Sequence, residues 1–128
     1  MEKYFIPYEI ALELKELGFD EPCLAFYWNT GKFYTTAEYP HSIETHKQNQ
    51  LGDYNYDSTS APTFSQAFRF FRDKYELYYT IEGSIKEGFQ YFVYTYEYEI
   101  KSEELFNTYE KTELVCLVKL IEIVKEKK

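Results

Sequence analysis

The chain has 128 residues, of which 45% are hydrophobic and 21% aromatic, so it can bury a real apolar core and is not a disordered chain. Its net charge of -8 argues against broad binding to phosphate backbones, which requires Lys and Arg. The same charge permits a basic partner, although it also serves solubility.

The first half of the chain predicts a helix, a hairpin and a long loop. Residues 7–18 have helical apolar spacing, and Gly18 can end this helix in a left-handed cap. Residues 23–36 are rich in β-formers around an Asn-Thr-Gly-Lys turn, which predicts a hairpin. Residues 37–61 show no period, and a connection of this length is usually either functional or disordered.

Residues 62–75 give the clearest helix prediction. Thr63 and Gln66 have the spacing of a capping box. The only two arginines, Arg69 and Arg72, lie one turn apart on the expected outer side. The apolar stripe, which leaves out Phe70, comprises Phe64, Ala67, Phe68, Phe71 and Tyr75.

The last part of the chain predicts a second hairpin and a closing helix. Strands at 77–82 and 89–100 are joined across a glycine-bounded turn. A helix over 108–126 begins at Asn107 or Thr108, which can cap it. Its apolar stripe is wider than one face, so this helix is either deeply buried or shared with a partner.

The element order α-β-β-α-β-β-α predicts an α+β fold, in which an antiparallel sheet of about four strands packs with three helices. We expect one domain over residues 1–128, with an irregular loop at 37–61.

The aromatic stretch 89–100 divides by the two-residue period of a strand. One face carries Phe89, Tyr91, Val93, Thr95, Glu97 and Glu99, and the other carries Phe92, Tyr94, Tyr96, Tyr98 and Ile100. Only the second face stays apolar to its end, so we expect the tyrosine row to face the helices. The first face turns acidic and faces water beyond Thr95, and its apolar start is a candidate for contact.

Residues that could carry catalysis or hold a metal are few. His41 and His46 lie five residues apart in the loop without metal-ligand spacing, and no phosphate-binding glycine loop is present. Cys23 and Cys116 lie in apolar runs, without zinc spacing and without a histidine nearby. We therefore expect no metal, no cofactor and no enzymatic activity.

The location expected from the sequence is the cytoplasm. No signal peptide opens the chain, and no apolar stretch approaches the ~20 residues of a membrane span. The layout of the second half is similar to that of double-stranded RNA-binding domains, which need lysines at the start of the last helix. That start instead reads NTYEKTELV, with Lys111 between Glu110 and Glu113, so RNA binding does not follow from the layout.

Three stretches, ALELKELGFDEPCLAFYW, SAPTFSQAFRFFRDKYELYY and YEKTELVCLVKLIEIVK, resemble a group of small, mostly uncharacterised proteins encoded in phages and prophages. The blocks consist of amphipathic helices and their caps, so they bring no catalytic residues. The resemblance implies a setting in which small acidic proteins often block host defence, including anti-CRISPR proteins that bind an effector nuclease.

We therefore expect a non-enzymatic, phage-derived protein that inhibits a bacterial defence nuclease such as an RNA-guided CRISPR effector, whose channel is basic. The candidate contact residues are Asp53, Tyr54, Tyr56 and Asp57 in the loop, Glu97 and Glu99 on the sheet, and Arg69 and Arg72 as a second patch. One alternative is a structural or accessory phage protein that self-associates, for example as a homodimer, through its last helix. Another is an enzyme that uses the loop carboxylates.

Overall fold

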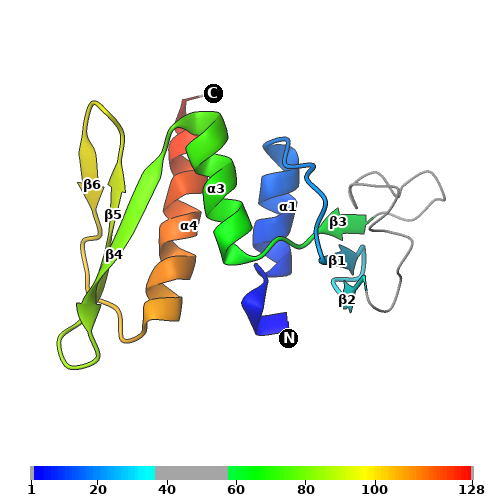
Figure 1. Ribbon diagram of the computed structural model, residues 1–128, viewed down its shortest axis with the longest axis horizontal. Coiled ribbons are helices and arrows are strands. Elements are labelled where there is room, and N and C mark those ends of the chain that lie inside the picture. The colour runs from blue at the N-terminus through cyan, green and yellow to red at the C-terminus, as the bar shows by residue number, and fades with distance from the viewer. Residues whose placement is uncertain (1, 37–57, 128) are drawn as a thin grey trace. The chain divides into compact units, whose positions relative to one another are not determined.

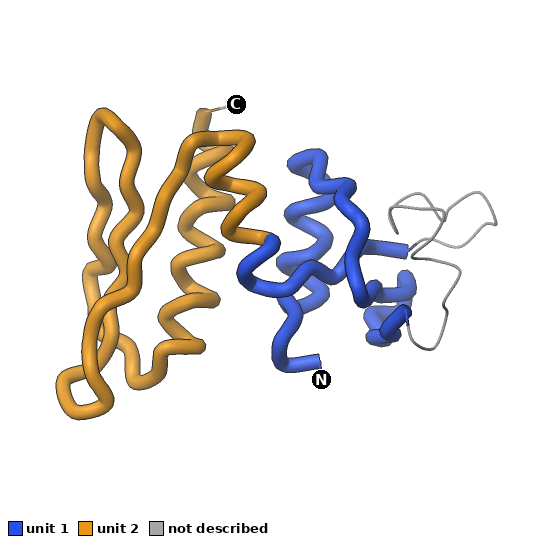
Figure 2. The backbone as a smooth tube through the Cα atoms, in the orientation of Figure 1, with its two compact units in different colours: residues 1–66 blue, residues 67–128 orange. Residues whose placement is uncertain are grey.

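The computed structural model describes residues 2–36 and 58–127. The chain divides into two compact units, which we call unit 1 (residues 1–66) and unit 2 (residues 67–128) (Figure 2). The boundary falls in the first turn of one helix, so the two units are joined without a linker. The expectation of a single domain stays a prediction.

Unit 1 combines short helices with a small antiparallel sheet. Its elements are η1 (Glu2–Tyr4), α1 (Tyr8–Glu16), β1 (Ala25–Trp28), β2 (Phe33–Thr35) and β3 (Ser58–Ser60). The strand order is β2-β1-β3, so β1 is the central strand. Both faces of β1 are covered, since Phe26 and Tyr27 point to opposite faces and are both buried. The Tyr27 hydroxyl donates a hydrogen bond of 2.7 Å to the Ile6 carbonyl.

Helix α1 ends in the predicted left-handed cap. Gly18 has a φ of 94°, which glycine adopts without steric cost. The Gly18 N–H donates to the Lys15 carbonyl at 3.0 Å, and the Phe19 N–H donates to the Leu14 carbonyl at 2.9 Å. These two bonds satisfy carbonyls at the end of the helix and return the chain toward β1.

The prediction of an irregular loop through residue 61 is wrong at its end, because Ser58–Ser60 form strand β3. All three residues are buried and pair with β1. A Ser-Thr-Ser sequence has neither the apolar residues nor the alternation by which a strand is recognised. The triplet is buried because it pairs with the aromatic central strand β1, and its own residues give no sign of that burial.

Unit 2 places two helices on the same side of a three-stranded antiparallel sheet (Figure 1). Its elements are α3 (Phe64–Tyr75, whose first three residues belong to unit 1), β4 (Tyr78–Ser84), β5 (Gly88–Tyr94), β6 (Glu99–Lys101) and α4 (Tyr109–Glu126). The order within the sheet is β4-β5-β6. The α+β class is therefore confirmed, but the described residues contain six strands in two sheets where we expected about four in one.

We predicted one strand over residues 89–100, but the structure has two strands, β5 and β6, separated by a tight turn at Tyr96 and Glu97. The Thr95 N–H donates to the Tyr98 carbonyl at 2.9 Å, which closes the hairpin. The Thr95 hydroxyl oxygen also accepts from the N–H groups of Glu97 and Tyr98, both at 3.0 Å. A threonine side chain thus makes the turn that Gly or Asn usually marks in a sequence.

This turn reverses the expected assignment of the sheet faces. Val93 is fully buried and Tyr91 is 7% exposed, so the face predicted to contact a partner packs against the helices. On the same face Phe68 of α3 stacks on Tyr79 of β4, with 3.8 Å between ring centroids. The tyrosine row predicted for the core is instead outside it, and Tyr96 is 86% exposed.

The helix signals of α3 and α4 agree with the structure except at one residue. Thr108 caps α4 by accepting from the Lys111 N–H at 3.0 Å. The capping box of α3 is present, since Thr63 and Gln66 exchange hydrogen bonds between side chain and backbone. Phe70, which we placed off the apolar stripe, is 7% exposed, because the face of α3 that is covered is wider than one stripe.

Candidate functional site

The structure separates the residues that sequence analysis proposed for contact. Asp53, Tyr54, Tyr56 and Asp57, and also His41 and His46, lie outside the described residues. Glu97 lies in the β5–β6 turn and Glu99 lies on β6, so the two carboxylates occupy different surfaces of unit 2. Both residues are exposed, as expected.

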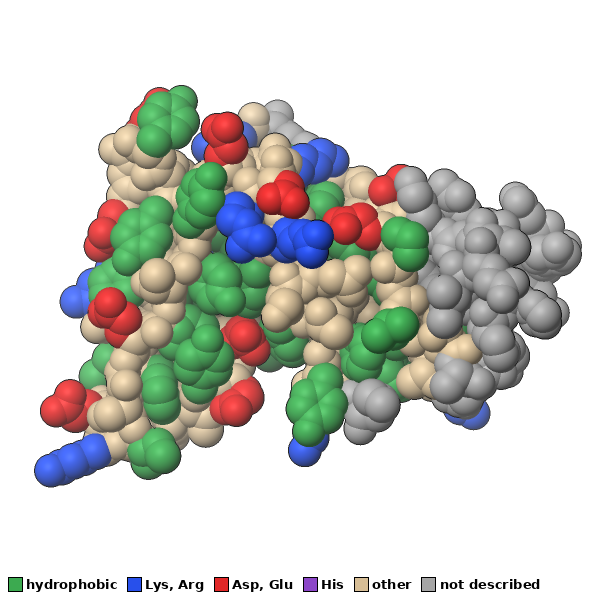
Figure 3. Space-filling view, in the orientation of Figure 1, with side chains coloured by type: hydrophobic (Ala, Val, Ile, Leu, Met, Phe, Trp, Pro, Cys, Tyr) green, Lys and Arg blue, Asp and Glu red, His purple; other side chains and the backbone are tan. Residues whose placement is uncertain are grey.

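The face of the unit 2 sheet that points away from the helices is the first candidate surface, and we call it the outer sheet face. The register of the strands places on it Tyr78, Thr80, Glu82, Gln90, Phe92, Tyr94, Glu99 and Lys101. Tyr78 lies directly opposite Tyr94, and Tyr94 lies opposite Glu99. Carboxylates therefore border the aromatic residues of this face. Figure 3 shows unit 2 from the side, where acidic and hydrophobic side chains lie beside one another.

The aromatic side chains of the outer sheet face contact one another and a neighbouring threonine. The rings of Phe92 and Tyr94 are nearly parallel, with 6.4 Å between centroids and an interplanar angle of 15°. The hydroxyl groups of Tyr94 and Thr80 form a hydrogen bond of 3.1 Å across the strands. Tyr78 is 48% exposed, while Phe92 and Tyr94 are half-buried. Such a partly apolar surface with polar tips is typical of a protein interface.

A small open pocket at the end of unit 2 is the second candidate, and we call it the hairpin pocket. It has a volume of about 180 Å³ and is lined by Tyr75, Glu76, Thr95, Tyr96, Glu97 and Lys127. Its walls come from the end of α3, the β5–β6 turn and the end of α4. Ligand sites for cofactors and similar molecules usually measure about 300–1,000 Å³, so this pocket fits a smaller group.

Glu76 of the hairpin pocket has an uncommon backbone conformation. Its φ is 55°, in the left-handed region, directly after the last residue of α3. Glycine is the usual residue at such a helix end, because a side chain there costs about 1–2 kcal/mol. Among the described residues Glu76 is the only one other than glycine with a positive φ. Residues held in this way are often found at functional sites.

The substitution Glu76→Gly is expected to raise the free energy of unfolding by about 1 kcal/mol, because it removes this strain while adding some chain entropy to the unfolded state. Urea unfolding followed by circular dichroism measures the change. Glu76→Ala keeps the strained backbone and is the control, for which we expect no gain. A gain with alanine equal to that with glycine would show that the carboxylate, rather than the backbone, is unfavourable.

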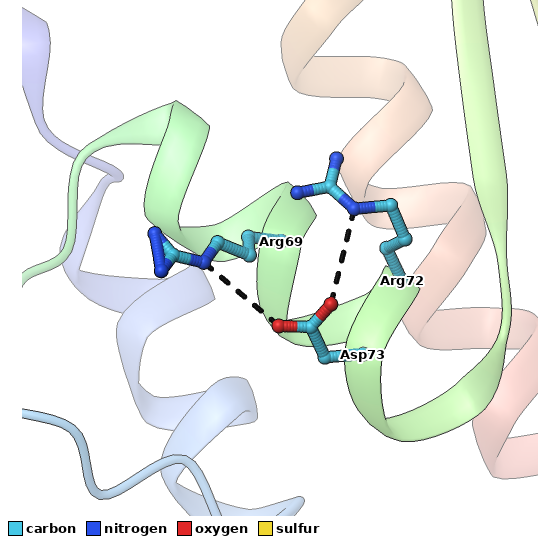
Figure 4. A network of polar contacts seen from close by, with 3 residues as sticks. All are labelled: Arg69, Arg72 and Asp73. Carbon is cyan, nitrogen blue, oxygen red and sulfur yellow. Dashed lines mark ion pairs between the residues drawn. The ribbon is translucent and has the colours of Figure 1, made fainter.

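The two arginines form a local ion-pair network on α3 (Figure 4). The Arg69 Nε lies 3.8 Å from one Asp73 carboxylate oxygen, and the Arg72 Nε lies 3.9 Å from the other. All three side chains are about half exposed or more, and exposed pairs contribute little to stability. Asp73 thus occupies both guanidinium groups, which makes this second predicted patch the weaker candidate.

Buried titratable groups lie in the cores of the two units rather than on the candidate surfaces. Burial raises the pKa of the Cys23 thiol to about 12, and it does the same for Cys116. Burial, followed by the nearby Glu110 carboxylate, raises the pKa of Glu113 on α4. A thiol with a raised pKa is a poor nucleophile, and both cysteines are buried, as their apolar surroundings indicated.

The described residues contain neither a metal-binding cluster nor a helix that could span a membrane. No group of three or more His, Cys, Asp or Glu side chains there could hold a metal ion. None of the helices in residues 2–36 and 58–127 has the length and apolar character needed to cross a membrane.

Sequence reasoning missed Tyr78, Thr80, Phe92 and Glu76 as surface candidates. A signal for Phe92 was present, because a turn formed by Thr95 ends the strand and separates Phe92 from the apolar residues that follow. The faces of Tyr78 and Thr80 follow only from the pairing of β4 with β5. Nothing in the sequence marks Glu76, because the left-handed conformation of a glutamate depends on how the chain continues from α3 into β4. No protein-family model matches the chain, and searches of curated proteins and of solved structures found no match either.

Proposed function

We propose that this chain is a non-catalytic binding protein that docks a partner protein on its outer sheet face. The observation that carries the proposal is the aromatic group formed by Tyr78, Phe92 and Tyr94 on a sheet face that no described helix of unit 2 covers. Tyrosines are frequent among the residues that dominate binding energy, because they combine large contact area with a polar tip. The carboxylates of Glu82 and Glu99 at the border favour a basic partner surface.

In its narrower form the proposal is that the partner is a host defence protein, such as an RNA-guided effector nuclease, and that this chain acts in the cytoplasm as a phage-derived inhibitor. The support for the narrower form is the resemblance of three sequence blocks to phage and prophage proteins. The net charge supports it as well, since an acidic protein is steered toward a basic channel. Residues 1–66 carry ten acidic and four basic side chains, so most of this charge belongs to unit 1.

The test is affinity capture of the tagged protein from lysate of a host with active defence systems, read by mass spectrometry. Capture of one effector at near-equal amounts supports the proposal. Capture of this chain alone, or of phage proteins, favours the alternative of a self-associating structural protein. A molar mass that increases with concentration in light scattering would be the second sign of that alternative.

The variant Tyr94→Ala is expected to weaken capture of the partner at least tenfold, a typical loss for a central aromatic contact. Tyr4→Ala in η1, which removes a more exposed tyrosine from unit 1, is the control. Charge reversal by Glu99→Lys should slow association and reduce its salt dependence. Its matched control is Glu87→Lys, in the turn between β4 and β5. An equal loss of partner binding in a variant and its control would show that the partner does not contact the outer sheet face.

A further inference from the structure

We propose that the chain forms a symmetric homodimer in which strand β4 of one copy pairs in antiparallel fashion with strand β4 of the other. β4 is an edge strand, because β5 is the only strand that is hydrogen-bonded to it within the described residues. Half of the backbone N–H and C=O groups of an edge strand point away from its own sheet. These groups are available to a further strand, which would extend the sheet.

Among the edge strands of the described residues, β4 alone is long and unprotected. β2, β3 and β6 have three residues each, whereas β4 has seven. Its register with β5 runs without a bulge from Tyr78 opposite Tyr94 to Ser84 opposite Gly88. Bulges, prolines and charged residues, lysine above all, commonly protect a sheet edge against another chain. β4 contains no Pro, Lys or Arg, and Glu82 is its one charged residue.

The sequence of β4 complements itself in one antiparallel register, in which Thr80 of one copy lies opposite Thr80 of the other. This register places Tyr79 opposite Ile81 twice, on the face that packs against the helices. It places Glu82 opposite Tyr78, so no carboxylate faces another. Pairs of two threonines, and of an aromatic with a β-branched residue, are favourable across antiparallel strands. The symmetric register centred on Ile81 instead puts Tyr79 opposite a glycine, which offers no side chain to pack.

The side chains that would meet in this register are accessible on β4. Tyr78 is 48% exposed, and Thr80 and Glu82 are exposed as well. Tyr79 and Ile81 are half-buried, so part of their apolar surface is still in contact with water. A second copy of β4 would bury more of this surface, which adds a hydrophobic contribution to the backbone hydrogen bonds.

Symmetry determines the architecture of such a dimer. Opposed residues of an antiparallel pair point to the same face, so a two-fold axis perpendicular to the sheet relates the two copies. Two three-stranded sheets then form one continuous sheet, with the helices of both copies on one side and both outer sheet faces on the other. The outer sheet face stays open to a partner, so the dimer does not depend on the proposed function and is compatible with it.

Light scattering of the full chain tests for the dimer, and we expect the molar mass to rise with concentration from one chain toward two. Thr80→Lys places two ammonium groups opposite each other and should weaken dimerisation about fivefold. Gln90→Lys, on the same sheet face but on the central strand β5, is the control and should leave the dimer unchanged. Thermal unfolding of both variants shows that the fold is retained.

A chain that stays monomeric at every concentration would overturn the proposal. A dimer that Thr80→Lys does not weaken would also overturn it, and would place the self-association on α4 instead.

Disulfide cross-linking tests the register directly. Thr80→Cys should give a covalent dimer on oxidation catalysed by copper phenanthroline, because directly opposed residues have Cα atoms ~5 Å apart, within reach of a disulfide. Glu82→Cys is the matched control, since the two copies of residue 82 would lie ~13 Å apart. Cys23 and Cys116 are buried, so the parent chain should not cross-link. Equal cross-linking of the two variants, or none with Thr80→Cys, would overturn the proposed pairing.

Discussion

Raising the pH from 8 to 11 is expected to lower the free energy of unfolding by about 5 kcal/mol through the two cysteines alone. Burial raises the folded-state pKa of Cys23 and of Cys116 from 9.0 to about 12. A raised folded pKa means that the neutral thiol is favoured in the folded protein. The stabilisation is therefore complete below pH 9 and is lost between pH 9 and pH 12, at about 2 to 3 kcal/mol per thiol by pH 11.

Urea unfolding at pH 8 and at pH 11 measures this loss. Each unit contains one of the cysteines, so Cys23→Ala and Cys116→Ala report on the two thiols separately. Each substitution lowers stability at pH 8, and it should also reduce the pH dependence by about half of the cysteine contribution. A remainder is expected from Tyr27, whose pKa burial raises to about 12. The same pH dependence in the double variant and the parent chain would contradict the assignment to the thiols.

Gly83→Ala is expected to destabilise unit 2 by about 3 kcal/mol or more. Gly83 is the next-to-last residue of β4 and lies opposite Phe89, with a φ of 145°, which side chains rarely adopt. A Cβ atom there would meet the carbonyl oxygen of Gly88 and would lie 2.7 Å from the Phe89 Cα. Because both neighbours are backbone atoms of the paired strand, the clash adds to the conformational strain and cannot be relieved by a rotamer change.

Gly31→Ala is the matched control, since Gly31 also has a positive φ, of 87°. Its Cβ would lie 3.3 Å from a ring carbon of the Tyr8 side chain, which can move. We expect a loss of about 1 kcal/mol there, from backbone strain alone. The difference between the variants, measured from urea midpoints, isolates the backbone clash. Equal losses would show that the β4–β5 turn opens readily to accept a side chain.

The register set at this turn also determines which side chains share the outer sheet face. Gly83 pairs with Phe89, and this alignment fixes the other pairs of β4 and β5, as far as Tyr78 with Tyr94. A shift by one residue would place Val93 outside and Tyr94 against the helices. The Gly83→Ala variant is therefore expected to disturb the proposed docking surface as well as the stability of unit 2.

Local signals in the sequence determined the helices and several of their ends. The left-handed cap at Gly18, the capping box of Thr63 and Gln66, and the cap at Thr108 each involve residues close in the chain, so their hydrogen bonds follow from short-range geometry. The α+β class follows from the order of these elements. The burial of the two cysteines likewise follows from their apolar neighbours in the sequence.

Only the tertiary structure decided the strands and the surfaces. Strand β3 exists because a polar triplet pairs with a buried strand far away in the chain, and no local pattern reports that pairing. Which sheet face the tyrosine row occupies depended on one turn. The two-residue period of a strand does not continue through Thr95, so residues before and after the turn cannot be assigned to one face together. The hairpin pocket unites Glu76 and Glu97, which are distant in sequence, because two connections of unit 2 end beside each other. Strand pairing and pocket geometry are long-range properties, so they emerge only when the whole chain is folded.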